Sequence, residues 1–280
     1  MGERFSAFSF VDRITEVAPG TRARGTFHVP SRVLEFPSAL VAEAVGQLAA
    51  WASMAHLGFR LRPVAGLAQE TRFLRPVKPG DLLELKTDIE NCTDDDVAYS
   101  GSATVGGNPV IALEQCLGPM LPAEEFDEPD ALRRDYEVLC GSGAPNDRFA
   151  GLPRFELERT ESVPGERMKA RLCVPTAAAF FQDHFPRRPV FPATLLLDCQ
   201  IRLALDLARE TTAAAEGSQL TASRILDVKI RSFISPGQVL ELSAEKVPAR
   251  DNAYSAKLSA RANGKPVATA RLEIVARKNA

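Results

Sequence analysis

The chain has 280 residues, too many for one ordinary domain and enough for two of about 120–140 residues each. Hydrophobic residues make up 45% of it and charged residues 25%, which is usual for a globular protein and excludes a disordered or collagen-like chain. With 34 Lys+Arg against 36 Asp+Glu, the net charge of -2 lacks the positive excess expected of a nucleic-acid-binding protein.

The sequence predicts a cytoplasmic protein. Residues Met1–Phe10 have no long apolar run, so no signal peptide is expected. The five cysteines are at least 24 positions apart, which argues against a disulfide framework or a structural zinc site and favours a reducing compartment. The most apolar stretch, Ala39–Ala55, is short for a membrane span and contains Glu43, so it indicates a buried helix and no membrane partner.

Two strands and a long helix are predicted to open the chain. The strands lie near Phe8–Val17 and Arg22–Val29, with a turn at Pro19-Gly20 between them. The helix is predicted over about Ser38–Leu57, because apolar residues recur there with a helical period. Further strands are predicted near Ala68–Leu74, Leu82–Glu90, Val97–Val105 and Val110–Leu117.

Residues 122–151 are predicted to be a linker. This range opens with the acidic run Glu124–Glu128, which we interpret as a solvated connector. A second long helix is predicted at Ala193–Arg209. It is followed by strands near Ile225–Phe233, Val239–Val247, Ala253–Ala262 and Pro266–Ala276.

Five short segments recur in the same order in the two halves of the chain. The shift between matching residues is 145 near Pro19, 155 at the predicted helices and 157 from Pro79 onward. We infer two copies of one unit, each with one buried helix and an antiparallel sheet, an α+β arrangement. The first copy lacks ten residues that the second carries between Pro175 and Pro192.

The second copy carries a distinctive motif immediately before its helix. It reads Phe180-Phe-Gln-Asp-His184-Phe-Pro-Arg-Arg-Pro-Val-Phe-Pro192. His-Phe-Pro-x-x-Pro-Val-x-Pro followed by an apolar helix with a carboxylate resembles the β-hydroxyacyl-acyl-carrier-protein dehydratases of the hotdog fold. The segments beginning at Phe10 and Phe73 are similar to that family as well.

The resemblance implies two tandem hotdog units, each an antiparallel sheet wrapped around a long central helix, that form a pseudo-dimer. The first unit is expected at residues 1–121, with a shortened histidine loop, and the second at 152–280, with the His184 motif. In the family, a histidine from one unit faces a carboxylate on the partner's helix. Mapped onto this chain, His184 faces Glu43. Asp198 marks a second site whose histidine is missing.

The chemistry of dehydration fits this pair. Histidine is a base near neutral pH, and Glu43 is a candidate acid because burial among apolar residues raises a carboxyl pKa. Gln47, four residues later, hydrogen-bonds Glu43 without adding charge, whereas Arg202 is placed to keep Asp198 ionised. The N–H of Ala193, at the start of the second helix, is expected to polarise the thioester carbonyl, although the family has glycine there.

We therefore expect a hydro-lyase of lipid metabolism or fatty acid biosynthesis that converts a 3-hydroxyacyl thioester to the trans-2-enoyl thioester without a metal or organic cofactor. The expected partner is an acyl thioester on acyl carrier protein or CoA. An isomerase, a thioesterase and a non-catalytic acyl-binding module stay open as alternatives. The sequence also leaves open the acyl chain length, the pathway, the activity of the Asp198 site and any oligomer beyond the internal pseudo-dimer.

Overall fold

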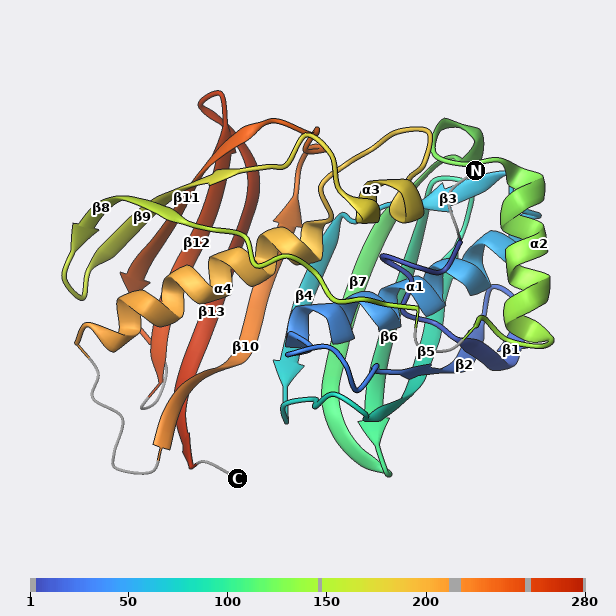
Figure 1. Cartoon of the computed structure of the whole chain (residues 1–280), viewed down its shortest axis with the longest axis horizontal. Coiled ribbons are helices and arrows are strands. Elements are labelled where there is room, and N and C mark those ends of the chain that lie inside the picture. Colours follow the sequence, from blue (N-terminus) through green and yellow to red (C-terminus); the bar gives the residue numbers. More distant parts are fainter. Residues whose placement is uncertain (1–3, 146–147, 212–217, 250–252, 279–280) are drawn as a thin grey trace.

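The computed structural model describes residues 4–145, 148–211, 218–249 and 253–278. Within them, one antiparallel sheet of 13 strands runs through the molecule, and two long helices lie against it (Figure 1). Each of the three predicted ranges, 1–121, 122–151 and 152–280, contains a few residues outside the described ones. These are residues 1–3, 146–147, 212–217, 250–252 and 279–280.

The strands come from both halves of the chain. Those before the predicted linker are β1 (Arg13–Ala18), β2 (Arg22–His28), β3 (Leu61–Pro63), β4 (Leu67–Phe73), β5 (Leu82–Cys92), β6 (Asp96–Val105) and β7 (Asn108–Pro122). Those after it are β8 (Glu158–Val163), β9 (Arg167–Cys173), β10 (Ser218–Ile230), β11 (Val239–Val247), β12 (Tyr254–Ala262) and β13 (Lys265–Lys278). Their order is β1-β2-β5-β6-β7-β4-β10-β13-β12-β11-β9-β8, and β3 pairs with β7 outside this path.

The predicted fold class is wrong in its architecture. We expected two hotdog units that each have their own sheet, but β4 pairs directly with β10 along Arg72–Leu67 and Arg224–Lys229, so the described strands form a single sheet. Strands make up 45% and helices 22% of the described residues, and a tandem of units built on long helices is only partly seen. Internal repeats identify equivalent strands, but they carry no information on which edges pair with each other.

The two long helices meet at their N-terminal ends near the middle of the sheet (Figure 1). They are α1 (Ser38–His56) and α4 (Ala193–Arg209), and each follows a proline, Pro37 or Pro192. Their apolar faces are buried against the strands, which is the main source of helix stability in a globular protein. The N-terminal ends of both helices therefore point at the same central region.

Three short elements were not predicted: β3, the helix α3 (Ala179–His184) and the helix α2 (Pro129–Cys140). A 3-10 turn, η1 (Ala123–Glu125), precedes α2. The signal for α2 was present in the sequence, because Pro129 suits a first helical turn and Leu132, Tyr136 and Leu139 follow a helical spacing. Among the helices of the described residues, none has the length and apolar character needed to cross a bilayer.

Candidate active site

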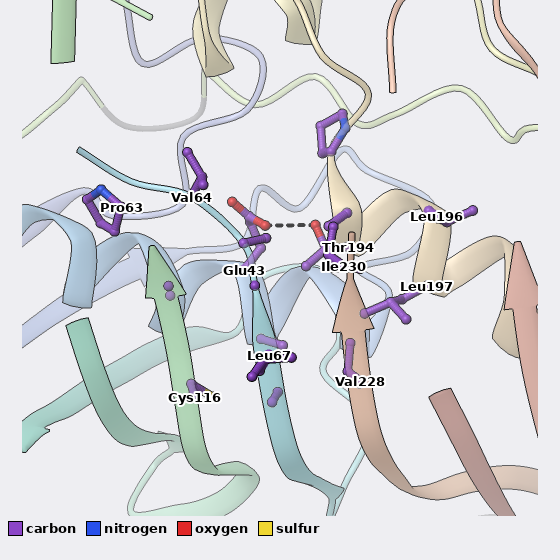
Figure 2. Close-up of a pocket in the computed structure, with 18 of the residues that line it drawn as sticks. Glu43, Pro63, Val64, Leu67, Cys116, Thr194, Leu196, Leu197, Val228 and Ile230 are labelled. Carbon is purple, nitrogen blue, oxygen red and sulfur yellow. Dashed lines mark hydrogen bonds between the residues drawn. The ribbon is translucent and has the colours of Figure 1, made fainter. Parts of the chain in front are cut away.

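A cavity of about 220 Å³ lies where the long helices meet the centre of the sheet (Figure 2). Its walls come from α1, α4, β4, β7, β10, the β3–β4 connection and the segment after α3. Thr71 of β4 and Ile225 of β10, which pair with each other, both line it. The lining is mostly apolar, as expected of a site for an acyl chain or another hydrophobic ligand.

Glu43 lines this cavity from α1, and both of its carboxylate oxygens have partners. Oε1 accepts a hydrogen bond from Gln47 Nε2 at 3.0 Å. Oε2 accepts one from Thr194 Oγ1 at 2.8 Å, which Figure 2 shows as a dashed line. Burial raises the pKa of Glu43, although these two hydrogen bonds and the charge of Arg62 oppose the rise. Glu43 is therefore better able to hold a proton than an exposed glutamate.

His184 ends α3 and lines the same cavity. Its ring stacks on Phe185 with centroids 4.0 Å apart and meets the edge of Phe8 at 5.0 Å. Burial, with the nearby cation of Arg62, lowers the pKa of His184 to about 3. The imidazole is therefore neutral at physiological pH.

Arg62 is a site residue that the sequence analysis missed. It lines the cavity from β3, its Nη2 donates to the main-chain oxygen of His184 at 3.0 Å, and its guanidinium lies 4.5 Å from the centre of the Phe185 ring. Burial lowers the pKa of Arg62 to about 10, a value at which it stays charged. The position of Arg62 in the cavity was not predictable from the sequence, because β3 has only three residues and its placement depends on pairing with β7.

The N-terminal end of α4 contributes two residues. Ala193 is the first residue of the helix and lines the cavity. The first N–H groups of a helix have no partner inside the helix and lie at its positive end, so they suit an oxygen that gains negative charge. Thr194, not predicted, donates to Glu43 and so links α4 to α1.

Asp198 has a different environment. It pairs with Arg202, with Nε 3.2 Å from Oδ2, and it is not among the described residues that line the cavity. Burial raises the pKa of Asp198, while Arg202 opposes the rise. The structure thus brings His184, Glu43, Gln47 and Ala193 around one region and leaves Asp198 apart from it.

The cavity lining includes a second polar pair. Tyr99 and Cys116 both line it and hydrogen-bond each other, and burial raises both pKa values, that of Cys116 to about 11. Gly46 on α1 makes room for the phenol, because a Cβ there would lie 3.2 Å from the Tyr99 hydroxyl oxygen. Both groups keep their protons at neutral pH.

The acidic run Glu124–Glu128 is not simply solvated. Glu128 pairs with Arg187, and Glu125 pairs with Arg188 at 2.7 Å. The Arg188 guanidinium also lies 5.6 Å from the Phe126 ring centre. The run therefore packs against the segment that follows His184 and helps to fix its position.

Comparison with known proteins supports a shared ancestry with dehydratases. A family model described as ApeI-like, ApeI dehydratase, matches residues 160–271. The 3-hydroxyacyl-[acyl-carrier-protein] dehydratase FabZ of Enterococcus faecalis is 33% identical over 112 residues, which cover 40% of this chain and 79% of that protein. The FabZ of Lactiplantibacillus plantarum is 29% identical over 124 residues, which cover 44% and 84%.

Solved structures similar to this one include thioesterases. The 12:0-ACP thioesterase of Umbellularia californica has a TM-score of 0.57 and 12% identity, with 91% of this chain and 94% of that chain covered. An acyl-ACP thioesterase of Bacteroides thetaiotaomicron has a TM-score of 0.55 and 10% identity, with 91% and 98% covered. At such identities the likeness shows the fold alone.

The fold and its structural relatives define a hotdog-fold protein. Within that class, the chain belongs to the family of 3-hydroxyacyl-[acyl-carrier-protein] dehydratases.

Proposed function

We propose that the protein eliminates water from a 3-hydroxyacyl thioester, carried on acyl carrier protein or CoA, to give the trans-2-enoyl thioester. One observation supports this most: a neutral imidazole and a buried carboxyl from different halves of the chain line one largely apolar cavity. Burial disfavours the charged form of each group, so the imidazole is present without a proton and the carboxyl is better able to keep the proton that it would donate.

In the proposed reaction His184 removes the proton from C2 of the acyl chain. The electron pair left at C2 forms the C2=C3 double bond, and the C3–O bond breaks. The leaving oxygen takes the proton of Glu43 and departs as water, so atoms and charge balance. The N–H of Ala193, at the positive end of α4, stabilises the negative charge that develops on the thioester oxygen.

Gln47 and Thr194 have a supporting role in this proposal. Their hydrogen bonds hold both oxygens of Glu43, so the carboxyl is oriented before substrate arrives. Such orientation matters because misplacing a reacting group by about 1 Å can cost about 10²-fold in rate. The second site expected at Asp198 has no comparable support, and we propose one catalytic centre in the chain.

The test is the hydration of crotonyl and longer enoyl thioesters, which is the reverse reaction and has the same transition state. We expect His184→Ala to lower kcat by about 10²–10⁴-fold, as loss of a general base does. The matched control is His56→Ala, at the end of α1 and outside the described cavity lining. Full activity of His184→Ala contradicts the mechanism. Bound acyl thioester without any turnover of the wild type favours an acyl-binding module instead.

A thioesterase is the second candidate, and the partners of Glu43 favour it. The hydrogen bonds from Gln47 and Thr194 favour the charged carboxylate, the form that activates a water molecule for hydrolysis. Release of free thiol from an acyl thioester, unaffected by His184→Ala, identifies this activity. Loss of that release in Glu43→Gln then assigns it to the same cavity.

A further inference from the structure

Residues 5–10, here called the N-terminal strap, run between the two residues proposed to carry the reaction. One end of the strap is bound by Asp183, the immediate neighbour of His184. The other end is bound by Gln47, which also holds Glu43. The strap therefore connects the surroundings of the proposed base with those of the proposed acid.

Asp183 binds the strap by accepting hydrogen bonds from its main-chain N–H groups. Its Oδ1 accepts from Phe5 at 3.0 Å, and its Oδ2 accepts from Ala7 at 3.0 Å and from Phe8 at 2.8 Å. Phe5 has a φ of 62°, a left-handed conformation that costs energy for a residue other than glycine. Several N–H groups that converge on one anion form a nest, and the Asp183 carboxylate is the anion that this strained turn encloses.

Gln47 binds the strap from the side of Glu43. Its Nε2 donates to the main-chain oxygen of Phe8 at 3.0 Å, and its Oε1 accepts from the N–H of Phe10 at 2.8 Å. The same Nε2 donates to Glu43 Oε1 at 3.0 Å. Hydrogen bonds thus run without a break from Asp183, through Phe8 and Gln47, to Glu43.

The strap also touches the imidazole itself. The buried ring of Phe8 meets His184 edge to face at 5.0 Å, and Phe185 stacks on His184 at 4.0 Å. The main chain of Phe8 is held by Asp183 on one side and Gln47 on the other, so the position of this ring is fixed. Two aromatic rings, one of them supplied by the strap, restrict where the imidazole can lie.

We propose that the N-terminal strap sets the position of His184 relative to Glu43, and that Asp183 is the positioning residue that holds it. This inference rests on the function proposed above. Both Asp183 oxygens accept main-chain N–H groups, and Asp183 is not among the described residues that line the cavity, so the residue acts through the strap and His184.

The first test is the kinetics of Asp183→Asn in the full-length chain. The amide keeps the shape of the side chain but replaces one acceptor oxygen with donors that oppose the N–H groups of the strap. We expect kcat for enoyl-thioester hydration to fall about 10–100-fold while KM changes less than about threefold. The control is Asp81→Asn, whose carboxylate accepts the N–H of Lys78 at 2.7 Å in an exposed turn. It is expected to leave both constants unchanged.

The second test needs no activity. The chain has three histidines, so ¹⁵N-histidine labelling gives few ring signals, and His184→Ala assigns the relevant one. We expect Asp183→Asn to change the His184 ring signals and to speed hydrogen exchange at the amides of Phe5, Ala7 and Phe8.

The two tests separate the strap from the enzyme activity. If the wild type is inactive but Asp183→Asn alters the His184 ring and the strap amides, the proposed function fails and the positioning role stands. If the wild type is active and Asp183→Asn leaves kcat, the ring signals and the exchange unchanged, the positioning role is overturned. A variant that lowers only thermal stability, or only raises KM, also overturns it.

Discussion

Glu43 and Asp198 occupy matching positions on α1 and α4, yet they have opposite electrostatic surroundings. Glu43 is held by a neutral amide and a hydroxyl and faces the cavity, whereas Asp198 pairs with the Arg202 guanidinium. The residue four positions after each carboxyl accounts for much of this electrostatic difference. It is Gln47 on α1 and Arg202 on α4. A neutral partner can orient a carboxyl without forcing it to stay ionised, and only such a carboxyl is useful as an acid.

The segments that precede the two helices differ as well. The segment before α4 contains α3, with His184 at its end, while the matching segment before α1 is ten residues shorter in the sequence comparison. The N-terminal part of α4 is therefore preceded by a histidine, whereas the carboxylate that α4 itself carries, Asp198, is held in an ion pair with Arg202.

The sharpest test of this contrast substitutes the two carboxyls in parallel. We expect Glu43→Gln to lower kcat for enoyl-thioester hydration by about 10²–10⁴-fold, because the amide cannot donate the proton that the leaving oxygen needs. Asp198→Asn should change kcat by less than about threefold. Steady-state kinetics of both variants measure this. Equal losses in the two variants contradict a single catalytic centre.

The pH dependence of stability should reveal the buried histidine that precedes α4 and has no counterpart before α1. His184 has a folded-state pKa of about 3 and an ordinary value of 6.5, so between these pH values the unfolded chain binds more protons than the folded one. Stability should therefore fall as pH drops from 6.5 toward 3, with a slope from this group of up to about 1.4 kcal/mol per pH unit. Urea unfolding of the wild type and of His184→Phe across this range measures the slope. If the free energies of unfolding of the wild type and of His184→Phe change with pH in parallel, His184 does not contribute to the acid sensitivity.

Substituting the residue four positions after each carboxyl should give Glu43 the electrostatic surroundings that Asp198 has now. Gln47→Arg places a cation beside Glu43, which lowers the pKa of that carboxyl and leaves less of the protonated acid. We expect kcat to fall about tenfold and the alkaline limb of its pH profile to move to lower pH. The reciprocal Arg202→Gln should leave the profile unchanged. An unshifted alkaline limb in Gln47→Arg counts against Glu43 as the acid.

The smallest expected effect comes from Arg62. Its charge adds to burial in lowering the pKa of His184, so Arg62→Met should raise that pKa and move the acid limb of kcat/KM to higher pH. We expect a shift of less than about one pH unit, because burial is the larger cause and remains. Arg62→Lys, which keeps the charge, should restore most of the wild-type profile. A profile of Arg62→Met that superimposes on the wild type removes this role.

The elements of the fold were largely predictable, because long periodic segments carry their own signal. The helix predicted at Ala193–Arg209 has those bounds in the structure, and the one predicted at Ser38–Leu57 ends one residue earlier. The joining of β4 to β10 was not predictable, since edge pairing depends on how distant segments meet rather than on their composition.

A motif or a helix position singled out His184, Glu43 and Gln47 in the sequence, and all three line the cavity, while their catalytic roles stay predictions. Arg62 and Thr194 reach the cavity only through tertiary packing, which a single sequence does not reveal. Asp183 lies next to His184 in the motif, yet its partners are main-chain groups more than 170 positions away, and no side-chain pattern encodes such contacts.

The hydrogen bonds between β4 and β10 limit how a ligand can reach Glu43. The cavity lies across this junction, with paired Thr71 and Ile225 in its wall, so the halves cannot swing apart on the sheet side without rupturing a backbone ladder. A ligand therefore has to reach Glu43 while β4 and β10 stay joined, so the sheet side of the cavity acts as a fixed wall.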